Sequence, residues 1–162
     1  MSESIETRLR DLGIVLPAPL QTPPGVRLPF TSVRVRGNRA FVSGHVPLNP
    51  DGSVAAPLGK IGKDLSLEEG AHAARLAGLA MIASLQRELG DLDRVTAWLR
   101  VFGMANMAPG FTQTSVVING CSELLLQVFG PERGAHARSA IGVAELPFNV
   151  PVEVEAEVEI RD

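Results

Sequence analysis

Residues 152–160 read Val-Glu-Val-Glu-Ala-Glu-Val-Glu-Ile, an unbroken alternation of apolar residues and glutamates. Because successive side chains of a β-strand point to opposite faces, this stretch predicts a strand with one apolar face and one acidic face. The apolar face needs a second layer of structure to cover it. The acidic face has three interpretations. Its glutamates are solvated, some of them pair with Arg34, Arg36 or Arg100, or one lies in a polar pocket between subunits.

Two earlier segments predict the helices of that second layer. Ser66 and Glu69 form a capping box, in which each side chain accepts a hydrogen bond from the other residue's backbone amide. The helix that follows is predicted to end at Gly90. Residues 115–129 place apolar side chains at helical spacing before Gly130, so they predict a second principal helix.

The other predicted strands fix the order of elements. Residues 33–36 and 39–43 read as a hairpin, and residues 94–104 form an apolar strand that meets no breaker before Gly103. Residues 138–146 precede the final strand. The order ββαβαββ requires a crossover connection, so we predict an α+β fold with a mixed sheet and both principal helices on one face.

The first 30 residues are predicted to be an N-terminal helix and a proline-rich linker, preceding a domain of residues 31–162. Within residues 2–13 three apolar residues recur at helical spacing: Ile5, Leu9 and Leu12. Residues 17–29 contain five prolines and predict an extended linker packed on the surface. We expect this extension to cover a cleft or an exposed sheet edge.

Composition and charge exclude several classes of protein. A length of 162 residues suits one core, and a net charge of −3 opposes nonspecific binding to nucleic acid. The N-terminus lacks the basic and apolar pattern of an export signal. Residues 73–85 form the most apolar stretch, which is too short for a membrane span of about 20 residues. The expectation is a cytoplasmic protein that binds neither nucleic acid nor membrane.

Cysteine and histidine usage predicts neither a disulfide nor a metal site. The single cysteine, Cys121, reads as a small buried apolar residue. The three histidines are scattered without metal-ligand spacing: His45, His72 and His136. We expect His45 and His136 to lie at the surface or the rim of a cleft, and we expect no metal or organic cofactor.

Two C-terminal segments carry a family resemblance. Residues 137–147 read ARSAIGVAELP and residues 152–156 read VEVEA, which resembles the C-terminal signature of the YjgF/Rid family of enamine and imine deaminases. Residues 41–47, FVSGHVP, and 117–119, VIN, are similar to two further segments of that family. The resemblance runs from about Val33 to the C-terminus and fits the longer form of the family best.

The resemblance implies a chorismate-mutase-like fold, a homotrimer, and clefts between adjacent subunits that bind a small carboxylate. Arg138 would hold the substrate carboxylate and Glu153 would orient a water molecule. The residues implied to bind substrate are Ser43, Gly44, Asn119, Ser139, Ala140 and Phe30. The implied reaction converts a 2-aminoacrylate-type enamine to its imine and hydrolyses the imine to a 2-oxo acid and ammonia, with no cofactor.

The residue types suit this chemistry, although each has a structural alternative. A guanidinium offers two parallel N–H donors to a carboxylate, and a carboxylate can accept a proton from the attacking water. Alternatively, Arg138 pairs with the glutamates of the last strand, Asn119 bonds locally within its helix, and Ser43 with Gly44 simply ends a strand.

Three departures from the family pattern keep other functions open. Ala140 stands where well-known deaminases often carry Cys, Phe30 where they often carry Tyr, and His45 where they usually carry Gln. These changes favour a noncatalytic, carboxylate-binding or regulatory trimer as the alternative function. The endoribonuclease activity often attached to the family fits an acidic chain poorly and is a remote alternative.

Overall fold

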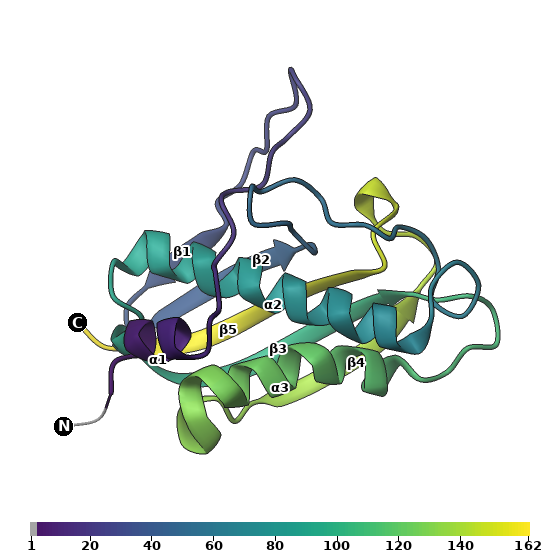
Figure 1. Cartoon of the computed structure of the whole chain (residues 1–162). Helices are drawn as coiled ribbons and strands as arrows, with labels where there is room; N and C mark the ends of the chain where they lie inside the picture. Colours follow the sequence, from purple (N-terminus) through teal and green to yellow (C-terminus); the bar gives the residue numbers. More distant parts are fainter. Residues whose placement is uncertain (1–2) are drawn as a thin grey trace.

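A mixed sheet forms one layer of the molecule and the helices form the other (Figure 1). The computed structural model describes residues 3–162. In chain order the elements are α1 (Ile5–Asp11), β1 (Val33–Arg36), β2 (Arg39–His45), α2 (Leu67–Leu89), η1 (Leu92–Arg94), β3 (Val95–Asn106), α3 (Thr114–Arg133), β4 (Ala137–Val143), η2 (Pro147–Asn149) and β5 (Val152–Ile160). The predicted α+β class and the order ββαβαββ are confirmed.

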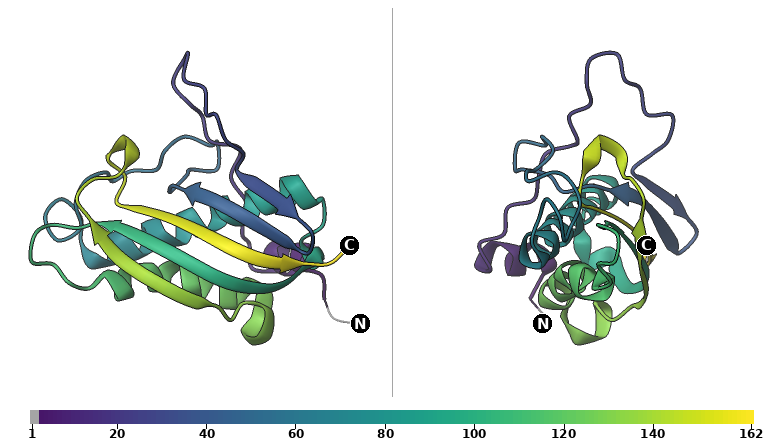
Figure 2. Two further views of the ribbon diagram at one scale, coloured as in Figure 1. Left: turned by 180° about the vertical axis from the view of Figure 1, so that it is seen from behind. Right: turned by 90° about the vertical axis from the view of Figure 1, so that its right-hand side faces the viewer.

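The last strand lies at the centre of the sheet, as its apolar alternation requires. The 5-stranded sheet has the order β1-β2-β5-β3-β4, and only the β3–β4 pair is parallel. The apolar side chains of β5 are buried beneath α2 and α3, whereas its glutamates face the other way. Figure 2 shows this second face, which no element among residues 3–162 covers and which we call the open face.

The glutamates of β5 find different environments on the open face. Arg39 pairs with Glu157, with Nη1 and Oε1 2.6 Å apart, and Glu159 accepts a hydrogen bond from the Thr96 hydroxyl. Glu155 is exposed, and Glu153 is half-buried. A glutamate of β5 therefore does pair with an arginine, but the arginine is Arg39 and not one of those predicted. Within the described chain, none of the three arginines named for this role pairs with these glutamates: Arg34, Arg36 and Arg100.

Local sequence signals define α2 as predicted. The Ser66 hydroxyl accepts from the Glu69 amide at 3.1 Å, and the Glu69 carboxylate accepts from the Ser66 amide at 2.8 Å. Gly90 ends the helix with a φ of 77°, a conformation that costs glycine little because it has no Cβ. Among residues 3–162, no helix is both long enough and apolar enough to cross a membrane.

Gly103 has a packing role in β3, the strand predicted over residues 94–104. The strand continues through Gly103 to Asn106. A Cβ at Gly103 would lie 2.6 Å from three side-chain carbons of Ile118, so the missing side chain lets α3 lie directly on the sheet. In contrast, Gly130 acts as predicted, because its φ of 81° and ψ of 172° interrupt the helical backbone of α3.

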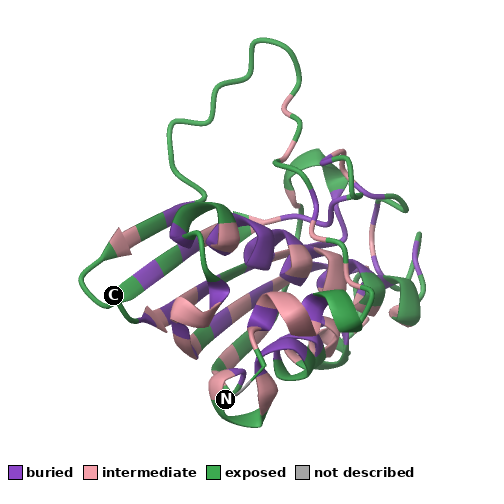
Figure 3. Cartoon of the chain, turned by 60° about the vertical axis from the view of Figure 1, so that its left-hand side comes forward, coloured by how far each residue is buried: buried purple, intermediate pink, exposed green. Residues whose placement is uncertain are grey.

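The N-terminal segment contributes to the core and then leaves it. Ile5 and Leu9 are buried with the main core, but Leu12 is 40% exposed, contrary to the predicted face. The predicted start of this helix, Ser2, lies outside the described residues. The linker packs against residues 50–52 only as far as Gln21, and residues 23–32 are all exposed in the projecting loop of Figures 1 and 3.

Replacement of Gly120 by alanine should destabilise the contact between α2 and α3. A Cβ there would lie 1.9 Å from the backbone oxygen of Ala71, so the two helices would have to separate. We expect Gly120→Ala to lower the free energy of unfolding by about 1–3 kcal/mol in urea. Gly78→Ala is the control, because its new Cβ would meet the flexible end of Leu124 at 2.9 Å. Equal stability of both variants would contradict this packing.

Candidate functional site

A pocket of about 300 Å³ lies beyond the end of β2, between the sheet, α2 and the N-terminal linker. We call it the Glu153 pocket. It gathers half of the residues that the sequence predicted for the site: Phe30, Ser43, Gly44 and Glu153. These residues come from the linker, the end of β2 and the start of β5, so the sheet register brings them together.

Gly44 allows the carboxylate of Glu153 to lie against the backbone of β2. The β2–β5 pairing is irregular between Val42 and His45, and a Cβ at Gly44 would lie 2.0 Å from Glu153 Oε1. Burial, together with the negative charge of Glu155, raises the pKa of Glu153 above its usual value of 4.5. A carboxylate with a raised pKa is a better proton acceptor from water, which suits the predicted role.

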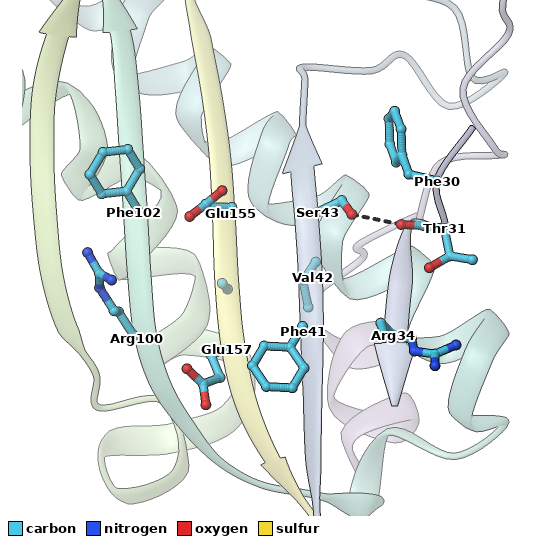
Figure 4. A pocket seen from close by; sticks show the side chains of 11 residues that line it. Phe30, Thr31, Arg34, Phe41, Val42, Ser43, Arg100, Phe102, Glu155 and Glu157 are labelled. Carbon is cyan, nitrogen blue, oxygen red and sulfur yellow. Dashed lines mark hydrogen bonds between the residues drawn. The ribbon is translucent and has the colours of Figure 1, made fainter. Parts of the chain in front are cut away.

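Ser43 fastens the linker to the sheet. Its hydroxyl donates to the Thr31 carbonyl at 2.7 Å (Figure 4). Its amide donates to the Ser32 carbonyl at 2.9 Å. The hydroxyl hydrogen is therefore already used, and only the oxygen lone pairs remain for a ligand.

His45 lies in a hydrogen-bonded network and not at the surface or rim, where we expected it. Its Nδ1 lies 2.6 Å from the Ser43 carbonyl and its Nε2 lies 2.8 Å from the Ser84 hydroxyl. Arg87 donates to the same hydroxyl at 2.9 Å and to the Pro17 carbonyl at 3.2 Å. Ser84 and Arg87 were not among the predicted site residues, and the one available signal in the sequence was that Ser84 interrupts the apolar run of residues 73–85.

The network fixes the protonation of His45. A carbonyl can only accept, so Nδ1 carries the hydrogen, and the neutral Nε2 accepts from Ser84. Burial lowers the pKa of His45 below 6.5, and the nearby charge of Arg87 lowers it further, against the opposing effect of the Ser43 carbonyl. His45 is therefore neutral at physiological pH.

Acid should destabilise the protein through His45. The histidine binds a proton near pH 6.5 in the unfolded chain but only at lower pH in the folded one, so acidification below pH 6.5 favours unfolding. We expect His45→Gln to lose stability less steeply than the wild type over that range, because a glutamine amide can bond both partners without titrating. Urea unfolding on either side of pH 6.5 measures the difference. Parallel curves for the two proteins would contradict a neutral His45.

The second group of predicted residues lies at α3 and β4. Arg138 donates to Asn119 Oδ1 at 2.9 Å and to Ser122 Oγ at 3.0 Å through Nη1. Its Nη2 donates to the Ser115 carbonyl at 3.2 Å. Arg138 thus does not pair with the glutamates of β5, and Asn119 bonds to this guanidinium.

The two residues that follow Arg138, Ser139 and Ala140, were also predicted to bind substrate. Ser139 is exposed, and Ala140 is half-buried with its carbonyl accepting from Thr114 at 3.3 Å. Cys121 is buried as predicted. Burial raises the pKa of Cys121 to about 12, although the nearby Arg138 charge acts in the opposite direction, so the thiol stays protonated.

The two groups lie apart within one chain. Glu153 pairs with Met104 of β3, whereas Arg138 pairs with Val101, so they are two strand spacings and three residues apart. Strand geometry places their Cα atoms about 14 Å apart. The Arg138 side chain contacts α3 on the helix side of the sheet. Glu153 belongs to the opposite face of β5, away from the buried apolar residues. One chain cannot bring both side chains to one small ligand in this arrangement.

The open face between these groups carries aromatic side chains and charges. Figure 4 shows Phe41 and Phe102 beside Glu155 and Glu157, around a hollow of about 380 Å³. The guanidinium of Arg100 lies 5.7 Å from the ring centre of Phe102. Phe41 is 45% exposed, which is a large exposure for an aromatic side chain on a sheet.

An acidic cluster near α1 has a structural explanation. Oxygens of Glu6, Asp91 and Asp93 lie within 4.8 Å of one another. Glu6 accepts from the Leu92 amide at 2.8 Å, and Asp93 pairs with Arg133 at 3.1 Å. These contacts tie α1 and α3 to the turn before β3.

Comparisons with known proteins agree with this architecture. The family model described as "YjgF/chorismate_mutase-like, putative endoribonuclease" matches residues 6–158. The Trypanosoma cruzi protein "Protein TCP17" is 41% identical over 161 residues, which cover 99% of this chain and 97% of the relative. The chain therefore belongs to the YjgF/chorismate-mutase-like family, as its motifs predicted.

Solved structures share the fold over nearly the full length. Atu1372 from Agrobacterium tumefaciens, a protein of unknown function, is 35% identical, with a TM-score of 0.86 and coverage of 97% of this chain and 92% of that one. A "putative endoribonuclease" from Shewanella oneidensis is 29% identical, with a TM-score of 0.87 and coverage of 98% and 100%. The E. coli YjgF gene product, at 23% identity, a TM-score of 0.58 and coverage of 99% and 100%, supports the fold alone.

Proposed function

We propose that this protein is a cytoplasmic enamine and imine deaminase whose sites lie between subunits of a homotrimer. The observation that supports the proposal is the division of the predicted residues into two complementary groups. One group offers a held guanidinium, Arg138, and the other offers a half-buried carboxylate of raised pKa, Glu153. Because the Cα atoms of the two residues lie about 14 Å apart in one chain and Arg138 faces the helices, a neighbouring copy would complete each site.

Arg138 is suited to hold a substrate carboxylate. Asn119 and Ser122 accept from Nη1 and hold the side chain in one orientation. Since Asn119 and Ser122 use both Nη1 hydrogens, the parallel pair left for a carboxylate is Nε and Nη2, and a ligand would replace the Ser115 carbonyl at Nη2.

Glu153 is suited to transfer the protons of the hydrolysis. Water attacks the imine carbon, one of its protons passes to the Glu153 carboxylate, and the carboxyl group passes it to the imine nitrogen. The resulting amino alcohol then collapses. Its hydroxyl proton passes through Glu153 to the departing nitrogen, the C–N bond breaks, and the products are a 2-oxo acid and ammonia. The carboxylate is unchanged at the end.

The open face is suited to contact a second copy. Phe41 and Ile141 are 45% and 42% exposed there, and Phe102 is half-buried beside them. Exposed apolar patches of this kind mark interaction surfaces in soluble proteins. Because Arg138 lies on the helix side of the edge strand β4, the β4 edge of one subunit would lie beside the Glu153 pocket of the next, and the family resemblance suggests three copies.

The direct test is release of pyruvate and ammonia from 2-aminoacrylate generated in situ. We expect the wild type to accelerate release over buffer, and we expect Arg138→Ala and Glu153→Gln to abolish the acceleration at equal concentration and matched oligomeric state. The control variants are Arg10→Ala in α1 and Glu132→Gln in the last turn of α3, which change exposed residues that belong to neither group. They should retain full activity.

The alternative functions predict different outcomes. A noncatalytic trimer would bind a small carboxylate and show a raised melting temperature without accelerating release. Cleavage of RNA that is lost in Arg138→Ala would favour the activity in the family description. The net charge of −3 weakens the second alternative, because nonspecific binding to RNA depends on basic residues.

A further inference from the structure

The Glu153 pocket has a largely apolar wall that the predicted reaction on 2-aminoacrylate does not need. Leu20 and Leu28 of the linker, Leu48 after β2 and Phe148 after β4 surround the space next to the carboxylate. Its volume of about 300 Å³ lies at the small end of the range of small-molecule sites, about 300–1,000 Å³. That is ample room for an amino-acid side chain.

The polar side chains that line the pocket, His45, Ser84 and Arg87, already form hydrogen bonds with one another. His45 uses both ring nitrogens, and the Ser84 hydroxyl both donates to His45 and accepts from Arg87. An apolar group placed against this wall leaves none of these bonds broken, so its burial carries little polar desolvation cost. The wall therefore favours an apolar ligand group over one that brings unpaired donors.

Phe148 is held over the pocket by an unusual backbone. Its φ is 58°, a left-handed conformation that bulky residues seldom adopt. The buried amide of Asn106 holds the surrounding turn by donating to the Gly59 carbonyl at 3.3 Å and the Val150 carbonyl at 3.4 Å. The Asn149 carbonyl also accepts from the Gly59 amide at 2.8 Å. The backbone that carries the Phe148 ring is thus held in place by hydrogen bonds to its neighbours.

We infer that the Glu153 pocket binds a branched aliphatic side chain and makes the protein selective for 2-imino acids of leucine size over 2-aminoacrylate. The inference rests on the proposed deaminase function and names its substrate class. The reacting carbon lies at Glu153, and the carboxylate points to Arg138 of the neighbouring copy. The side chain then extends away from that copy, between Leu28, Leu48 and Phe148.

Binding of 2-oxo acids tests the inference without relying on turnover. We expect 4-methyl-2-oxopentanoate to bind the full-length protein at least about tenfold more tightly than pyruvate in titration calorimetry, because extra carbons in an apolar pocket improve binding by that order. Turnover of the imino acids made in situ from leucine and alanine by an amino-acid oxidase should show the same preference.

Substitutions of the apolar pocket residues test whether they cause the preference for the larger 2-oxo acid. Phe148→Gly and Phe148→Asn introduce residues that tolerate the left-handed backbone at this position. Leu28→Ala shortens a side chain of the linker that also lines the pocket. We expect each variant to reduce the preference to about threefold or less while pyruvate affinity stays within about twofold. Leu126→Ala is the matched control, because Leu126 is 41% exposed on α3 and Leu28 is 40% exposed.

Each outcome separates the inference from the proposed function. Equal affinity for both 2-oxo acids, or a preference that survives every wall variant, would overturn the inference even if both imino acids are hydrolysed. A preference that the wall variants remove, with no turnover of any imino acid, would support the pocket assignment and overturn the deaminase proposal.

Discussion

Gly44→Ala should lower the turnover of a 2-imino acid by at least about 100-fold, because a displacement of about 1 Å in a reacting group has effects of this size. The new methyl carbon would lie 2.0 Å from Glu153 Oε1, far inside contact distance. The carboxylate, which is the flexible partner, must move away. Backbone strain does not contribute, because Gly44 is not among the residues with positive φ.

The measurement combines kinetics with unfolding in urea. We expect the loss to appear in kcat, with stability close to that of the wild type, because the displaced group is a side chain at the edge of a pocket. Gly142→Ala is the control, since Gly142 is also a strand glycine without positive φ, and its added Cβ would meet the flexible Met107 side chain at 3.2 Å. Wild-type activity in Gly44→Ala would remove Glu153 from the mechanism.

Mixing two inactive variants should restore activity. Arg138→Ala alone should lose about 10²–10³-fold in kcat, as removal of an electrostatic partner does, and Glu153→Gln alone should lose at least about 10²-fold. If each site takes Arg138 from one subunit and Glu153 from the next, about a quarter of the sites in a randomly assembled equal mixture are intact. The mixture should therefore reach about a quarter of wild-type activity.

The controls for this experiment address assembly. Equal amounts of the variants are unfolded and refolded together, and the same variants refolded separately and then mixed should stay inactive if subunits do not exchange. The double variant refolded alone should also stay inactive. Activity that remains at the sum of the two single variants, in verified mixed oligomers, would contradict a site shared between subunits.

Local signals in the sequence were sufficient for the fold. The alternation of residues 152–160 and the capping box of Ser66 each depend on neighbours in the chain, so both could be predicted, and both are confirmed. The family motif likewise located Gly44 and Glu153, which the register of β2 and β5 brings together. Signals of this kind need no knowledge of tertiary packing.

The features that the sequence did not reveal depend on distant contacts. Ser84 and Arg87 looked like ordinary helix residues, because their partner His45 is separated from them by a long loop. The close packing of Gly103 against Ile118 is likewise a contact between two different elements, β3 and α3. The left-handed backbone of Phe148 follows from a turn held by Asn106, and no sequence pattern encodes that turn.

The burial of Cys121 has a consequence for oxidative stress. A thiol is oxidised or alkylated through its thiolate, and a pKa of about 12 leaves almost none of that form at neutral pH. Ala140 also removes the sulfur that related deaminases often carry beside the arginine. With one cysteine in the chain, and that one buried and protonated, the proposed site contains no thiolate for peroxide or electrophiles to attack. Catalysis should therefore continue under oxidising conditions that inactivate enzymes with a reactive cysteine.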